Sequence, residues 1–161
     1  MSILDPYYLK QEEVVNHLAQ AAEQIPEDKI MWKPTEKALT WLFLIHHTST
    51  HRDLFLKLFK GESIDFPGCY RDPANQARSG AESAQIMRKT WEDLKSFLQS
   101  QPDDYAKTVI EKPPWGGPPM TVEQLVWWTY EENVHHRGQA WVYARMNGLI
   151  PPTIWGTEDL K

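Results

Sequence analysis

Apolar residues recur at helical spacing in four stretches of the chain, and proline or glycine marks the end of each. The stretches cover residues 5–24, 37–60, 81–101 and 121–146. No segment alternates convincingly between apolar and polar residues, as a half-buried strand would. Four helices without strands predict an all-α fold, a four-helix bundle.

Residues that favour helix ends support these boundaries. Asp5 is a plausible N-cap for the first helix, and Thr121 with Gln124 three residues later forms a capping-box pattern for the fourth. Residues 62–80 and the proline- and glycine-rich segment 111–120 predict two long loops. Connections of this length allow consecutive helices to run parallel rather than strictly up and down.

Helical wheels place histidine and glutamate side chains on faces that are otherwise apolar. In the second helix, His47 and His51 fall inside the apolar arc one turn apart, whereas His46 is expected to face solvent. In the fourth helix, Glu132 and His136 lie in the middle of the apolar face. We therefore expect two histidines from one helix to meet a glutamate and a histidine from another inside the bundle.

A buried carboxylate needs a positive partner, because an unpaired charge is costly to bury. No lysine or arginine shares the face of Glu132 on its own helix. Imidazole and carboxylate together suit Zn²⁺, Ni²⁺, Fe²⁺ or Mn²⁺, and helix bundles build metal sites from facing helices in this way. The pattern predicts a divalent-metal site, and a buried Glu–His hydrogen-bonded network without metal is the alternative.

Charge and composition limit the classes of partner and the cellular location that we expect for this protein. The 161 residues carry a formal net charge of −5 without a basic stripe, which argues against nucleic acid as a partner. The longest apolar run, residues 41–45, is far too short to cross a membrane. A single cysteine, Cys69, excludes an internal disulfide, and the first ten residues lack a signal-peptide pattern. We expect a cytoplasmic protein with one domain over residues 1–161.

Tryptophan is unusually abundant, with 8 residues in the chain. Because tryptophan is large and half-polar, this abundance indicates an aromatic-lined pocket or a dimer interface in addition to core packing. We expect Trp32, Trp115 and Trp128 to contribute pocket walls together with the two long loops.

Several short motifs resemble those of the DinB/YfiT-like family, whose members are regarded as metal-dependent enzymes. The last helix carries Val-His-His-Arg-Gly-Gln at residues 134–139, followed by Asn-Gly at 147–148 and Pro-Pro at 151–152. Trp-Lys-Pro at 32–34 and His-His at 46–47 resemble that family's entry into its second helix. The resemblance spans nearly the whole chain.

The resemblance implies a bundle of up-down-down-up order, often a homodimer, that binds a divalent ion through three histidines. One of these lies on the second helix and two lie four residues apart on the last. His47 matches the first, with His46 as the runner-up, and His136 matches the last. Glu132 replaces the remaining histidine, which implies the ligand set His47, Glu132 and His136; His51 as third ligand is the alternative.

The resemblance also implies a function, because family members with known activity are metal-dependent thiol S-transferases and isomerases. The expected activity is transfer of a low-molecular-weight thiol to an electrophilic substrate, as in detoxification or a stress response. His51 is the candidate proton acceptor, and Gln139 and Tyr143 are candidates to orient the ligands. A metal-dependent hydrolase and a non-enzymatic, stress-induced binding protein with a structural metal, or none, are the alternatives.

Overall fold

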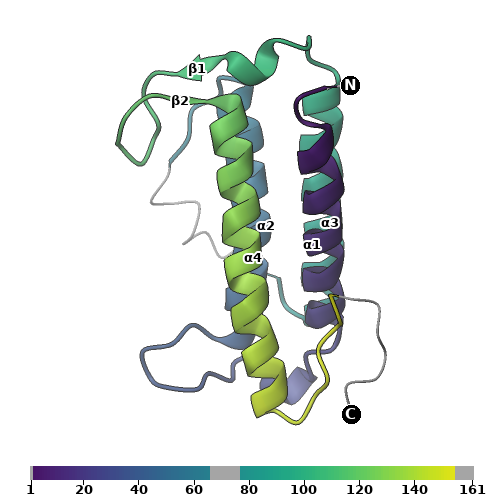
Figure 1. The fold of residues 1–161 in the computed structure, drawn as a ribbon. Helices are drawn as coiled ribbons and strands as arrows, with labels where there is room; N and C mark the ends of the chain where they lie inside the picture. The colour runs from purple at the N-terminus through teal and green to yellow at the C-terminus, as the bar shows by residue number, and fades with distance from the viewer. Residues whose placement is uncertain (1, 66–76, 155–161) are drawn as a thin grey trace.

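The computed structural model describes residues 2–65 and 77–154. Its described part contains four long helices, two 3₁₀ turns and one pair of two-residue strands (Figure 1). The elements in chain order are α1 (Asp5–Glu23), η1 (Glu27–Lys29), α2 (Trp41–Phe59), α3 (Gly80–Gln99), η3 (Tyr105–Lys107), β1 (Val109–Ile110), β2 (Met120–Thr121) and α4 (Val122–Met146). The predicted all-α four-helix fold is confirmed, with the short strand pair as a local addition.

Contacts between α1 and α3 show that these two helices run in opposite directions. The start of α3 meets the end of α1, where Gly80 is required because a Cβ there would collide with the carbonyl oxygen of Ala22. Further along, Arg88 of α3 pairs with Glu23, and Lys95 pairs with Glu12, 11 residues earlier in α1.

The other helix pairs complete the topology. Tyr7 of α1 contacts Thr129 of α4, and His17, further along α1, contacts Arg137, further along α4. These two helices are therefore parallel. In α2, His46 approaches Ser83 and Arg52 approaches Thr90 of α3, which makes α2 and α3 parallel as well. The order is therefore up-down-down-up, and the helices follow one another around the bundle as α1, α3, α2, α4.

Helix ends differ from the predicted ones where local hydrogen bonds decide them. The second helix begins at Trp41 rather than Lys37, because the Thr40 hydroxyl caps it by accepting from the Phe43 amide at 3.3 Å. Asp5 is the first residue of α1 and not its N-cap; Leu4 takes that position without a side-chain bond. The predicted loop over 62–80 falls mostly outside the described residues, as does Cys69.

The fourth helix begins as predicted. The Thr121 hydroxyl accepts from the Gln124 amide at 3.2 Å, and the Gln124 side chain accepts from the Thr121 amide at 2.8 Å, which completes the capping box. The proline-rich segment before it leaves the bundle as a loop between β1 and β2, at the end where α3 stops and α4 starts (Figure 1).

Helix α2 is buried on two sides, because it packs against both α3 and α4. His46 is only 3% exposed, and its Nδ1 lies 3.3 Å from Ser49 Oγ and 3.4 Å from Ser83 Oγ. The expectation that His46 faces solvent is wrong, because a single-face wheel does not account for the second neighbour of α2. None of the helices in residues 2–65 and 77–154 has the length and apolar character needed to cross a membrane.

Candidate metal centre

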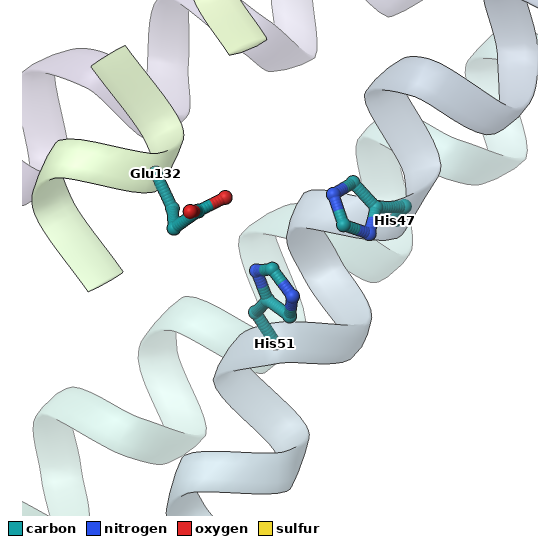
Figure 2. A group of neighbouring side chains, drawn as sticks. All are labelled: His47, His51 and Glu132. Atoms are coloured by element: carbon teal, nitrogen blue, oxygen red, sulfur yellow. The ribbon is translucent and has the colours of Figure 1, made fainter. Parts of the chain in front are cut away.

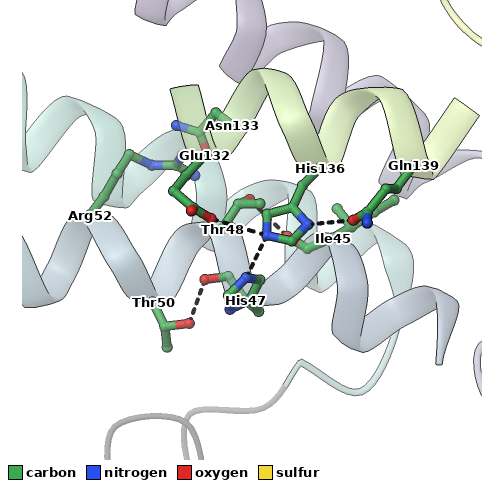
Figure 3. Close-up of polar contacts among 9 residues, drawn as sticks. All are labelled: Ile45, His47, Thr48, Thr50, Arg52, Glu132, Asn133, His136 and Gln139. Atoms are coloured by element: carbon green, nitrogen blue, oxygen red, sulfur yellow. Dashed lines mark hydrogen bonds and ion pairs between the residues drawn. The ribbon is translucent and has the colours of Figure 1, made fainter. Parts of the chain in front are cut away.

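Four candidate ligands lie at the interface between α2 and α4, halfway along the bundle. His47 and His51 are one turn apart on α2, and Glu132 and His136 are one turn apart on α4. The two helices are antiparallel, so the two pairs of side chains project toward each other across the interface (Figures 2 and 3). His136 is buried, whereas the other three are half-buried and keep contact with the surface.

The polar atoms of this group converge closely. His47 Nε2 lies 2.7 Å from His136 Nε2, and Glu132 Oε2 lies 3.3 Å from that same nitrogen (Figure 3). The ring centroids of His47 and His51 are 4.4 Å apart. A contact of 2.7 Å is a hydrogen bond, whereas two ligands of one tetrahedral ion lie roughly 3.3 Å apart. Binding of an ion therefore requires the two rings to separate by about half an ångström and the proton between the two nitrogens to leave.

His51 belongs to this group as closely as the predicted ligands do. Among the described residues, the set whose ligand atoms all lie within 4.8 Å of one another is His47, His51 and Glu132 (Figure 2). His136 adjoins two members of that set through the contacts above. The structure thus brings together the predicted ligands and the alternative His51, whereas His46 lies on the opposite side of α2, toward α3.

Burial keeps these histidines in the neutral form that binds metal. Burial, and next the like charges of His51 and His136, lower the pKa of His47 to about 3. Burial, then His136 and Arg52, lower the pKa of His51 to about 4. Burial also lowers the pKa of His136, although hydrogen bonds to Gln139 and the nearby Glu132 act in the opposite direction. Near neutral pH the site offers imidazole lone pairs beside one carboxylate.

Gln139 defines which nitrogen of His136 carries the proton. Gln139 Oε1 lies 2.8 Å from His136 Nδ1 and can only accept, so Nδ1 is protonated and Nε2 has its lone pair directed at the site. The Glu132 carboxylate oxygen also faces Nε2. Two acceptors that face each other need a cation or a proton between them, and this donor set fits a divalent metal ion.

A buried arginine joins the two helices next to the site, and our sequence analysis missed it. Arg52 is 0% exposed and lies beside Asn133 (Figure 3), and its guanidinium donates to Asn133 Oδ1 at 3.1 Å. It also donates to Thr90 Oγ1 at 3.4 Å. Because Arg52 follows His51 and Asn133 follows Glu132, this bond positions both ligand pairs. The signal was present, since Arg52 lies 11 residues after Trp41 and therefore inside the apolar arc of its helix.

The remaining expectations have mixed outcomes. Gln139 contacts the candidate ligand His136, whereas the Tyr143 hydroxyl donates to the carbonyl oxygen of Leu39 at 3.2 Å. Trp115 and Trp128 line a pocket, described below. Trp32 is not among the lining residues of that pocket, and its ring packs edge-on against Tyr143 at a centroid distance of 5.3 Å.

Comparison with known proteins identifies the family. Residues 12–140 match the model of the DinB superfamily. The uncharacterized protein YjoA of Bacillus subtilis is 25% identical over 144 residues, which cover 88% of this chain and 87% of YjoA.

Solved structures support the same fold. The crystal structure of DinB-like YjoA superposes with a TM-score of 0.70 at 19% identity, covering 93% of this chain and 98% of that one. A DinB-like protein of Bacillus cereus gives 0.74 at 18%, with 94% and 97% covered. A conserved protein of Enterococcus faecalis gives 0.66 at 17%, with 89% and 95% covered. Because the family model matches residues 12–140, which is most of this chain, the chain belongs to the DinB superfamily.

Proposed function

We propose that this protein is a divalent-metal-dependent transferase that joins a low-molecular-weight thiol to an electrophilic substrate. The observation that supports the proposal is the convergence of His47, Glu132 and His136 at the α2–α4 interface, with a carboxylate oxygen and an imidazole lone pair 3.3 Å apart. The set of two histidines and one carboxylate suits Zn²⁺, Ni²⁺, Fe²⁺ or Mn²⁺.

In the proposed site, His47, Glu132 and His136 would hold the ion, and Gln139 would keep His136 in the correct tautomer. A bound divalent ion would act as a Lewis acid that lowers the pKa of a thiol in an open coordination position, so that the thiol reacts as thiolate. His51, whose ring lies beside that of His47, would accept the thiol proton. The Glu132 side chain is 35% exposed, which leaves a path from solvent to the ligands.

One observation favours a second function, a closed structural metal site in a binding protein. The potential ligand atoms of His51, His47 and Glu132 all lie within 4.8 Å of one another, so His51 could bind the same ion. Four protein ligands would fill a tetrahedral ion and leave no position for thiol or water. A hydrolase would use the same open position to activate water. The homodimer and the cytoplasmic location implied above stay predictions.

The first test is metal content by mass spectrometry on tag-free protein purified without chelators. We expect near-stoichiometric metal in the wild type and loss of metal in His47→Ala, Glu132→Ala and His136→Ala. His135→Ala is the matched control, because His135 is an exposed histidine next to His136 on the same helix. No metal in the wild type, even after reconstitution with Zn²⁺ or Ni²⁺, would rule out the proposal.

His51→Ala separates the enzymatic from the structural function. If His51 is the proton acceptor, the variant keeps its metal and loses transfer of a thiol such as glutathione or cysteine to a chromogenic aryl halide. If His51 is a fourth ligand, the variant loses metal together with the other three, and the transferase proposal fails.

A further inference from the structure

A pocket of about 700 Å³ opens beside the first half of α4, outside the candidate metal centre. Its walls include Trp115 from the loop between β1 and β2, and Trp127 and Trp128 from α4. None of the four candidate metal ligands lines it. The volume lies within the range of about 300–1,000 Å³ that is typical of small-molecule sites.

Packing holds the aromatic walls in place. The rings of Trp115 and Trp128 meet nearly edge-on, with centroids 5.0 Å apart and planes at 73°, and Phe55 supports Trp115 at 5.6 Å. Trp127 rests against the buried Tyr7 at 5.9 Å. All three tryptophans remain half-exposed, so ring surface stays available to a ligand.

The charged side chains among the described lining residues have one sign. Glu123 and Glu131 lie two turns apart on the pocket side of α4, and the described lining includes no lysine, arginine or histidine. Within the part of the chain that the structure describes, no ion pair joins either carboxylate to a basic side chain. Both carboxylates are therefore available to a positively charged ligand.

An inorganic ion does not explain this arrangement. In residues 2–65 and 77–154, the group with metal-ligand spacing is that of His47, His51 and Glu132, and the pocket has none of its own. Aromatic ring faces carry a partial negative charge and attract cations that are weakly hydrated. Tryptophan is the most effective ring for this purpose, and alkylated ammonium groups are the ligands it recognises best.

We propose that the pocket formed by Trp115, Trp127 and Trp128 with Glu123 and Glu131 binds a small organic cation that carries an alkylated ammonium group. The tryptophans contact the alkyl substituents, and the carboxylates balance the charge from the rim. The volume leaves space for a larger organic group attached to the ammonium.

Calorimetric titration with choline tests the proposal against 3,3-dimethyl-1-butanol, which has the same shape with carbon in place of the charged nitrogen. We expect choline to bind at least about tenfold more tightly than the neutral alcohol. We also expect its affinity to fall in Glu131→Gln and with rising salt. Equal affinity for the two compounds would overturn the proposal, as would the absence of choline binding.

Two features keep the test decisive. Glu131 is exposed, so Glu131→Gln leaves the core intact, and Glu92→Gln changes an exposed helical glutamate on α3 as the control. The titrations are run with EDTA present, so the outcome does not depend on the metal centre. If Glu131→Gln and Glu92→Gln bind choline as tightly as the wild type, the pocket is not the cation site. Dimerisation that buries the tryptophans and excludes choline would likewise overturn the proposal.

Discussion

Gln139 Oε1 accepts a hydrogen bond from His136 Nδ1 at 2.8 Å, and this bond directs the other ring nitrogen of His136 toward His47 and Glu132. Partners of this kind set the tautomer and the ring orientation of metal-binding histidines. In the proposed metal site, Gln139 would therefore orient His136 without contacting the ion itself.

We predict that Gln139→Ala weakens metal binding by roughly 10- to 100-fold, because His136 loses the acceptor that fixes its tautomer. Competition against a chromophoric zinc chelator measures the effect. Gln139→Glu retains an acceptor and should restore most of the affinity. Gln20→Ala, at an exposed position of α1, is the control. Equal affinities for Gln139→Ala and the control would show that Gln139 has no role in orienting His136.

Substitutions of Glu132 test whether its carboxylate binds metal directly. Glu132→Gln keeps the shape of the side chain and removes its charge. If Glu132 binds the metal directly, the loss of metal affinity should exceed the 10- to 100-fold that is typical when a residue hydrogen-bonded to a ligand is replaced. Glu132→His introduces the third histidine that the family resemblance implies, and we expect it to retain metal. A carboxylate ligand favours Mn²⁺ more than an imidazole ligand does, so Glu132→His should lower the affinity for Mn²⁺ relative to Zn²⁺. Chelator competition with each metal measures this change in preference. Unchanged affinity in Glu132→Gln would place Glu132 outside the ligand set.

The sequence was sufficient to predict the helices and the inward direction of the candidate ligands. Apolar residues repeat with the helical period, and His47, His51, Glu132 and His136 occupy positions within those stripes. The same periodicity cannot tell how many neighbours a helix has. Helix α2 contacts both α3 and α4, so His46 and Ser49, on its nominally polar face, are buried as well.

The sequence also does not predict which buried polar side chains pair between helices. Arg52 and Asn133 are 81 residues apart, and their hydrogen bond depends on the register of α2 against α4, which periodicity does not specify. Arg52 in an apolar arc was a visible anomaly, but its partner was not identifiable without the packing.

We predict that Arg52→Ala destabilises the protein by about 3–5 kcal/mol, because it creates a cavity and leaves Asn133 Oδ1 without its donor. Arg52→Met fills most of the space and should cost less. Urea unfolding of metal-free protein gives the free energies. Arg88→Ala is the matched control, since Arg88 forms a surface pair with Glu23 in which both side chains are 43% exposed, and such pairs contribute about 0–1 kcal/mol. The prediction fails if Arg52→Ala costs no more than Arg88→Ala.

Tyr7 makes stability depend on alkaline pH. Its hydroxyl lies 3.1 Å from Thr129 Oγ1 in the core, and burial raises its pKa well above the ordinary value of about 10. Above about pH 10 the unfolded chain releases this proton while the folded protein retains it, so the unfolded state binds fewer protons and stability falls as pH rises. The stabilising contribution of the neutral, buried Tyr7 is thus fully present below about pH 10 and is lost above it.

Tyr7→Phe isolates this effect, because phenylalanine fills the same space and has no proton to release. At about pH 8 the variant should be less stable than the wild type by about 1 kcal/mol, the typical net value of one hydrogen bond. Above about pH 10 the wild type should lose stability more steeply than the variant, so the difference narrows. Urea midpoints measured for both proteins across this range provide the test. A constant difference at every pH would mean that Tyr7 ionises equally in the folded and unfolded states.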